Sequence, residues 1–386
     1  MNGKTADSRL VVAVIPTDYA PGRAELRGVS DAAARLGWAL EVIDWMRDAV
    51  DMSQFLPLLS KADGAIVRLN GPLADGTLSR LGIPIVGIDV SGEEARRHLW
   101  ASLRLAERKV GETAADELAA IGRRCLAFVP VVGRDWTKTR GKAFVARARA
   151  LGCDARYYSH PQGLGWAERR AAFSRYLAAL PRPFGVFAGT DALSRFVFGA
   201  CAAAGLKIPE DAAVIGADDD ETVCLSSSPH LSSIRIDFEG AGRKAVELLA
   251  SLMGRPRPAR HVTVRFQPLG VSRRASTRTV SDAADPRVSA ALDFIAMHAQ
   301  DPTIGAADVA RAMFVCRRQA DRLFRATGKS IREHIEDARI ERVKALLRTG
   351  GRTVAGVAAE CGFASASYLS SVFRRKTGSS IRAWRR

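Results

Sequence analysis

Short apolar runs alternate with longer amphipathic stretches through the first two thirds of this 386-residue chain. The first apolar run, at 9–15, is followed by a stretch at 21–36 whose apolar residues recur at helical spacing. This repetition predicts βαβ units, in which helices cover both faces of a parallel sheet. The predicted strands are 9–15, 38–43, 64–67, 85–88, 124–130, 155–158, 185–188, 213–217 and 261–268.

The predicted helices divide this part of the chain into two similar halves. After a helix at 105–121, the alternation of strands and helices starts again with the strand at 124–130. We therefore expect an α/β bilobed sensor built on two doubly wound parallel sheets, which would bind its ligand at the carboxyl ends of the strands. The predicted helices are 21–36, 52–59, 75–81, 105–121, 136–151, 168–180, 192–204 and 239–253.

The last hundred residues follow another pattern, in which two similar helical pairs occur one after the other. In the stretch 353–378, Gly362 separates two apolar series that each have helical spacing, and the stretch 309–328 has the same layout. Each pair predicts a helix-turn-helix unit, whose second helix fits a DNA major groove. An amphipathic helix at 330–348, ended by Gly350 and Gly351, would connect the units and present them about one DNA turn, roughly 34 Å, apart.

The charge of the chain is concentrated in this C-terminal region. The formal net charge is +17, and residues 287–386 hold 19 Lys and Arg against 9 Asp and Glu, a net +10. A basic domain of this kind indicates a polyanionic partner. Together with the helix-turn-helix pattern, the charge predicts binding to double-stranded DNA.

Several other classes of protein are disfavoured by composition. The six cysteines form no C-x-x-C pair and the six histidines lack metal-ligand spacing, so we expect neither disulfides nor a metal or other cofactor. No apolar run approaches the roughly 20 residues of a membrane span. The run at 10–15 is too short for the core of an export signal. These features predict a cytoplasmic protein without a membrane partner.

The run E-C-G-F…S-Y-L…F-R-R-K-T-G at 360–378 resembles the signature of the AraC/XylS family of DNA-binding domains. The resemblance covers about the last hundred residues and implies two helix-turn-helix units. Ser371 stands where the family often carries Arg, and Ile381 replaces its usual Pro. We therefore expect base readout mainly from the first unit and phosphate binding from the second. The predicted DNA-binding residues are Arg317, Arg318, Asp321, Arg322, Ser365, Ser367, Ser371, Arg374, Arg375 and Lys376.

The first two thirds of the chain resemble the LacI/periplasmic-binding-protein family. The resemblance rests on F-A-G-T-D-A at 187–192, V-I-G-A-D-D-D at 214–220 and L-S-S-I-R at 231–235. Sugar sites of that family combine a stacking aromatic ring with carboxylates and an arginine. The resemblance therefore implies a ligand site that contains Trp136, Arg140, Asp191 and Asp218 or Asp219. In an alternative interpretation, Asp191 only caps the following helix, and 218–220 is a solvated acidic turn.

One departure from the family leaves the ligand open. Ser102-Leu103-Arg104 stands where relatives have Ser/Thr-Asp-Asn, so a carboxylate is lost and a guanidinium is gained. An anionic ligand, such as a sugar acid or a sugar phosphate, is therefore an alternative to a xylose-like sugar. Arg23, Arg68 and Arg104 are its candidate receptors, because arginine forms two parallel hydrogen bonds with a carboxylate or phosphate. The same arginines could equally lie on the surface.

The predicted domains are a sensor at 9–275, a linker at 276–286, and a DNA-binding domain at 287–386 that begins with a helix at 288–298. Together they predict a ligand-responsive transcription regulator, in which ligand binding changes how a dimer presents its domains to paired half-sites. The resemblance favours activation. Expected partners are duplex DNA, a sugar-like effector and a second copy of the chain, with RNA polymerase as a further candidate.

Three other functions are alternatives to regulation. A sugar-metabolising α/β enzyme with a basic accessory tail would need a nucleophile–base pair or a metal site, and the sequence pattern indicates neither. A transport receptor would need an export signal. A constitutive architectural DNA binder would need no sensor, and DNA binding that is independent of any sugar would support it.

Overall fold

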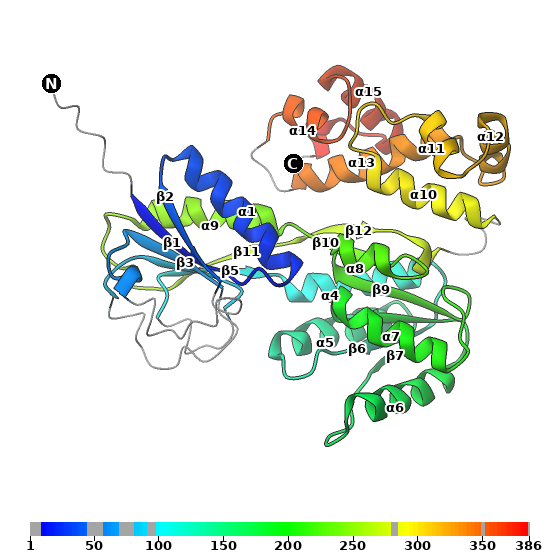
Figure 1. The fold of residues 1–386 in the computed structure, drawn as a ribbon, viewed down its shortest axis with the longest axis horizontal. Helices are drawn as coiled ribbons and strands as arrows, with labels where there is room; N and C mark the ends of the chain where they lie inside the picture. Colours follow the sequence, from blue (N-terminus) through cyan, green and yellow to red (C-terminus); the bar gives the residue numbers. More distant parts are fainter. Residues whose placement is uncertain are drawn as a thin grey trace. The chain divides into compact units, whose positions relative to one another are not determined.

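The computed structural model describes residues 9–44, 57–68, 81–90, 98–278, 285–348 and 352–384 (Figure 1). The chain divides into two compact units, residues 1–109 with 236–268 and residues 110–235 with 269–386. Each unit contains one sheet with six described strands. The second unit also contains the C-terminal helices.

The sheet of the first unit has the strand order β11-β5-β4-β3-β1-β2. Every strand pair recorded in it is parallel. The strands β1, β3, β4 and β5 are almost wholly buried, as expected for a parallel sheet between two layers. The strands are β1 (Leu10–Val14), β2 (Ala39–Ile43), β3 (Gly64–Val67), β4 (Ile85–Ile88), β5 (Ala101–Leu105) and β11 (Val262–Phe266).

Helices α1 (Ala20–Arg35) and α9 (Phe238–Leu252) pack against each other although 202 positions separate their last and first residues (Figure 1). Two glycines make this close contact: a Cβ on Gly28 would lie 1.9 Å from the Glu239 carbonyl oxygen, and one on Gly242 would lie 2.1 Å from that of Glu25. Both helices contribute to one core with β1, β3, β4 and β5. The chain therefore returns to the first unit after building most of the second.

The sheet of the second unit has the order β12-β10-β9-β8-β6-β7. Its strands are β6 (Cys125–Val129), β7 (Asp154–Tyr157), β8 (Phe184–Ala188), β9 (Ala212–Asp218), β10 (Ser232–Ile236) and β12 (Pro268–Ser272). The helices that accompany it are α4 (Glu107–Ala120), α5 (Asp135–Ala150), α6 (Trp166–Ala178), α7 (Asp191–Ala203), α8 (Glu221–Ser226) and the 3₁₀ helix η2 (Ala275–Thr277). We call this part of the second unit the sensor lobe 2, and the sheet of the first unit with α1 and α9 the sensor lobe 1.

The C-terminal domain is wholly helical in its described residues. Its helices are α10 (Pro286–His298), α11 (Ala306–Ala312), α12 (Arg317–Arg325), α13 (Ile331–Arg348), α14 (Val354–Glu360), α15 (Ala366–Thr377) and α16 (Ile381–Trp384). One core contains Ile331 and Ile335 of α13 with α10, α11 and α12. A second core contains Ile340 and Val343 of α13 with α14, α15 and α16. Two helix-turn-helix units thus share one central helix.

The predicted fold class is confirmed: two mostly parallel α/β sheets are followed by an all-α helix-turn-helix domain. Among the described residues, no helix is both long and apolar enough to cross a bilayer. The six cysteines form no disulfide. The predicted helices at 52–59 and 75–81 lie largely outside the described residues, as do Gly350 and Gly351.

Several boundaries were predicted wrongly. Strands β5, β10 and β12 and helices α8 and α16 were missed, and Leu105 ends a strand instead of opening a helix. The strand β12 has the sequence PLGVS, and its Pro and Gly are residues that disfavour strands, so the sequence pattern did not predict it. Ser276 and Thr277, assigned to the linker at 276–286, are buried in η2, where Ser276 Oγ donates to the Val214 carbonyl at 2.6 Å. These two residues therefore belong to lobe 2.

The turn of each helix-turn-helix unit contains a residue in the left-handed region. In the second unit it is Gly362, with φ 73°, and in the first it is Phe314, with φ 54°. A Cβ on Gly362 would lie 2.7 Å from the Gln300 carbonyl oxygen and 2.8 Å from that of Ala299. The second turn therefore packs directly on the end of α10, where only glycine fits.

We expect Gly362→Ala to destabilise the DNA-binding domain by about 2 kcal/mol or more. The left-handed conformation alone costs an L-residue about 1–2 kcal/mol, and the contact with α10 adds to that cost. Thermal unfolding followed by circular dichroism checks this. Gly199→Ala in α7 is the matched control, because its Cβ would meet only the Arg170 side chain at 3.6 Å. That substitution should raise stability by about 0.5–1 kcal/mol; equal effects of the two would contradict the prediction.

Candidate effector and DNA-binding sites

Trp136 and Arg140 lie together at the carboxyl edge of the lobe 2 sheet. Both come from the first turns of α5, which follows β6, and the Arg140 guanidinium stacks 4.6 Å from the centre of the Trp136 ring. Arg140 is buried and donates from Nη1 to the carbonyl of Gly189, just after β8. The structure therefore brings these two predicted effector residues together at the ends of neighbouring strands.

Asp191, a predicted effector residue, is enclosed within lobe 2. It is only 1 % exposed, and it accepts hydrogen bonds from Ser233 Oγ at 2.6 Å and from the Asp220 amide at 2.8 Å. Burial, reinforced by the charge of Asp218, raises the pKa of Asp191 well above its usual value. It is not the helix cap either, because Thr190 caps α7. Asp191 therefore joins α7, β10 and the loop after β9.

Asp218 is the last residue of β9 and Asp219 is the first residue after it, and both have positive φ angles, 112° and 55°. Such conformations are costly for residues other than glycine and often occur at functional sites. Asp219 forms an ion pair with Arg274 at 2.8 Å and accepts from Ser272 Oγ at 2.7 Å. Asp218 is half-buried at the strand end. Both carboxylates stay predicted effector residues.

Lobe 1 has its own polar cluster at the carboxyl edge of its sheet, centred on Arg68. The guanidinium is buried at the end of β3, forms an ion pair with Glu25, and donates from Nε to the Tyr19 hydroxyl at 2.9 Å. Asp89, after β4, lies 3.8 Å away. These opposite charges outweigh burial and raise the pKa of Arg68. Arg68 is thus already matched by carboxylates of its own lobe.

The other two arginines proposed as receptors for an anion lie on other elements of lobe 1. Arg23 is exposed on the first turn of α1 and donates to the Thr17 carbonyl at 2.9 Å. Arg104 lies within β5, where its neighbour across the sheet is Arg265 of β11. A shared anion site of these three arginines therefore stays a prediction.

Sequence reasoning missed Glu25, Tyr19 and Asp89 in this cluster. Tyr19 and Asp89 each follow a strand closely, so their position after an apolar run could have indicated the sheet edge. Glu25 lies on the buried face of α1, three positions after Gly22 and four before Val29. A charged residue on the apolar face of a predicted helix is the signal that could have found it.

In the first helix-turn-helix unit, helix α12 presents a basic face. Ala320 and Phe324 are buried, while Arg318 and Arg322 are exposed, and neither has an ion-pair partner among the described residues. Asp321 also faces outward, but its carboxylate is held by Arg317 at 3.1 Å, one helical turn away. Of the predicted base-reading residues, Arg318 and Arg322 are therefore exposed and unpaired in the described part of the chain, whereas Arg317 and Asp321 are paired with each other.

In the second unit, two of the three basic residues at the end of α15 contact α13. Arg375 lies 2.7 Å from Glu336, and Lys376 lies 2.7 Å from Asp337. Glu336 is also bound by Arg332 at 3.3 Å. This corrects the expectation that Arg374, Arg375 and Lys376 are all available to phosphates. Arg374 is exposed and has no ion-pair partner in the described part of the chain.

The predicted serines lie on the exposed face of the same helix. Ser367 and Ser371 are exposed, and Ser365 is the N-cap of α15, where its hydroxyl oxygen accepts from the Tyr368 amide at 3.1 Å. A capping hydroxyl can still donate its own hydrogen to a phosphate oxygen. The position of all three remains consistent with backbone contacts, which stay a prediction.

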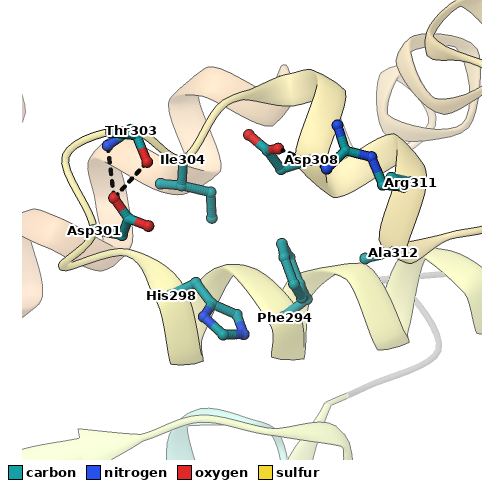
Figure 2. Close-up of a pocket in the computed structure, with 8 residues that line it drawn as sticks. All are labelled: Phe294, His298, Asp301, Thr303, Ile304, Asp308, Arg311 and Ala312. Atoms are coloured by element: carbon teal, nitrogen blue, oxygen red, sulfur yellow. Dashed lines mark hydrogen bonds and ion pairs between the residues drawn. The ribbon is translucent and has the colours of Figure 1, made fainter.

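A cavity of about 350 Å³ lies in the DNA-binding domain, where α10 faces α11 and the loop before it (Figure 2). The rings of Phe294 and His298 are 4.4 Å apart on one wall, and Asp301 accepts two hydrogen bonds from Thr303 on the other. None of its lining residues is a predicted effector residue. No group of side chains in the described residues is arranged to hold a metal ion.

Comparison with known families matches both halves of the chain. Residues 115–277 match the periplasmic binding protein-like domain, and residues 309–386 match a helix-turn-helix domain of AraC type. The chain is an AraC-type transcription regulator with a periplasmic-binding-protein-like sensor. The two matches lie on lobe 2 and on the two helix-turn-helix units, so the regulator is responsive to a ligand.

Two relatives and one solved structure match most of the chain. The regulator is 26 % identical to the xylose operon regulatory protein of Haemophilus influenzae over 321 residues, which are 81 % of this chain and 82 % of that one. It is 27 % identical to the protein of the same name in Escherichia coli K12, over 81 % of each chain. The solved structure of a xylose-binding transcription activator covers 98 % of both chains with a TM-score of 0.60 at 22 % identity.

The different environments of Arg374 and Arg375 give opposite expectations for two neighbouring substitutions. Arg374→Ala should weaken binding to all DNA sequences by a similar factor and lower the salt slope by about one unit, because one phosphate contact is lost. Arg375→Ala should mainly lower stability, by about 0.5–1.5 kcal/mol, since Glu336 loses a partner that is itself half exposed. Fluorescence anisotropy across salt concentrations and thermal unfolding measure the two effects. A larger salt-slope change for Arg375→Ala would overturn the assignment.

Proposed function

We propose that this regulator binds paired DNA half-sites as a homodimer and that a neutral sugar, sensed by the two lobes, controls this binding. The observation that carries the proposal is the shared helix α13, which joins two helix-turn-helix units in a chain whose sensor lobes have polar clusters at their strand ends. Two units on one helix suit successive major-groove faces. A sensor of this class can shift DNA binding only by binding its effector differently in two states.

The charges at the strand ends favour a neutral polyol over an anion. In lobe 1, Arg68 is paired with Glu25 and lies near Asp89. In lobe 2, Asp219 is paired with Arg274, and Asp218 is a further carboxylate at the end of β9. Hydroxyl groups donate hydrogen bonds to carboxylates, whereas a carboxylate or phosphate ligand would be repelled by them. The relatives named for the xylose operon make D-xylose the first candidate.

The relatives are transcription regulators, and we infer a binding role without catalysis. A regulator of promoters acts where DNA is transcribed, so we place it in the cytoplasm, with RNA polymerase as a candidate partner. Because a named relative is an activator, activation of sugar-catabolic genes is the proposed direction of control.

We expect D-xylose and related neutral sugars to raise the melting temperature, and D-glucuronate and D-xylose 5-phosphate to leave it unchanged. Ligand binding to the folded form stabilises it by mass action. Trp136→Ala should weaken effector affinity by roughly tenfold, about 1.4 kcal/mol, by removing a stacking face. Trp166→Ala is the matched control, because Trp166 stacks on Arg170 at 4.5 Å in the same one-turn arrangement on α6. A melting-temperature rise with the anions alone would reverse the proposed effector class.

For the DNA half, Arg318→Ala should relax base preference in a selection from random duplexes. An arginine that reads a guanine edge contributes about 1–3 kcal/mol of discrimination. Arg311→Ala serves as the control, because Arg311 is exposed on α11, outside the recognition helix, and is paired with Asp308 at 3.3 Å. If both variants retain the wild-type base preference at fixed salt, α12 is not the main reader.

A further inference from the structure

The carboxylate of Asp293 is buried on the side of α10 that faces away from the core of its own domain. Val288, Ala291 and Ile295 occupy the core-facing side of the helix. Asp293 is two positions away from both Ala291 and Ile295. Residues two positions apart do not share a face of a helix, so Asp293 lies on the opposite side. Its side chain is nevertheless only 4 % exposed. Another part of the chain must therefore cover it.

Two side chains of sensor lobe 2 provide that cover. His230 Nδ1 lies 3.0 Å from one carboxylate oxygen of Asp293, and Arg278 Nη2 lies 2.9 Å from the other. Arg278 directly follows η2, and His230 lies shortly before β10. Burial raises the pKa of Asp293, and the positive charge of Arg278 opposes that shift. Both oxygens of this carboxylate are thus matched by groups of the sensor.

A continuous set of contacts leads from this carboxylate to the strained turn after β9. The backbone of Ser276 in η2 donates to the His230 carbonyl at 2.9 Å. Arg274, just before η2, donates from Nη1 to the Leu231 carbonyl at 3.0 Å, and its Nη2 forms the ion pair with Asp219. Asp219 adjoins Asp218, and both are predicted effector residues. Arg274 therefore touches both the candidate effector edge and the segment that holds Asp293.

We propose that Asp293, His230 and Arg278 form a latch that couples the sensor to the DNA-binding domain and that opens or closes with the effector state. This inference rests on the proposed function, because a latch of this kind regulates only if an effector controls DNA binding. A buried ion pair contributes little net stability but is specific in its geometry, since desolvation offsets its attraction. Separation would return all three groups to water, so the contact can be reversed at small cost.

The coupling is tested in the full-length protein with Asp293→Asn and Arg278→Gln. DNA affinity for the fragment upstream of its own gene is measured with and without D-xylose at fixed salt. We expect the ratio of the two affinities to fall at least fivefold in both variants, while D-xylose still raises their melting temperature. Arg278→Lys keeps the charge, so its affinity ratio should lie between that of the two variants and that of the wild type. A wild-type ratio in Asp293→Asn would overturn the latch.

The matched control is Asp301→Asn, which removes the same charge from an exposed residue of the same domain and should keep the wild-type ratio. If the wild type itself does not respond to D-xylose, the proposed effector is wrong, and the latch is judged by amide hydrogen exchange without ligand. Asp293→Asn should then speed exchange in α10 and η2 by about tenfold relative to the wild type and to Asp301→Asn. Unchanged exchange in both segments would show that no latch exists.

Discussion

The DNA-binding domain depends on the burial of α13 in two separate cores. Ile331 and Ile335 belong to the first core, and Ile340 and Val343 to the second. Because one rigid helix serves both, the orientation of each recognition helix is set relative to the other. Ion pairs strengthen this arrangement on one side, where Glu336 binds Arg332 and Arg375. Basic residues that resemble phosphate ligands in sequence are thereby used to hold α15 in place.

The sensor uses charged groups in a comparable way. Three charged residues of the types that bind sugars already have partners within their own lobe. Asp191 is bonded to Ser233, Asp219 to Arg274 and Arg68 to Glu25. Matched pairs of this kind fix the side chains of a binding edge before a ligand arrives. The free-energy cost of ordering those side chains on binding is therefore lower. Trp136, Arg140 and Asp218 are the other predicted effector residues of lobe 2.

Control of DNA binding requires that a change at the strand ends reach the helices. Two residues at the end of β9, Asp218 and Asp219, have costly backbone conformations. Arg274 binds Asp219 while it also holds the segment beside Asp293. Strain that is released or increased by a ligand can therefore act on α10 through a few direct contacts. Such coupling needs only two arrangements of similar free energy, not a large deformation of either domain.

The sequence by itself determined the class of fold, most strands and helices, and both helix-turn-helix units. These follow from apolar periodicity, which is a local property of the chain, and from the motif at 360–378. It did not determine which charged side chains are free. Arg375 bonds to Glu336, which is 39 positions away. Asp191 bonds to Ser233, 42 positions away, and Glu25 pairs with Arg68, 43 positions away. Only the tertiary structure decides such pairs, because a charge that is solvated in one fold is neutralised in another.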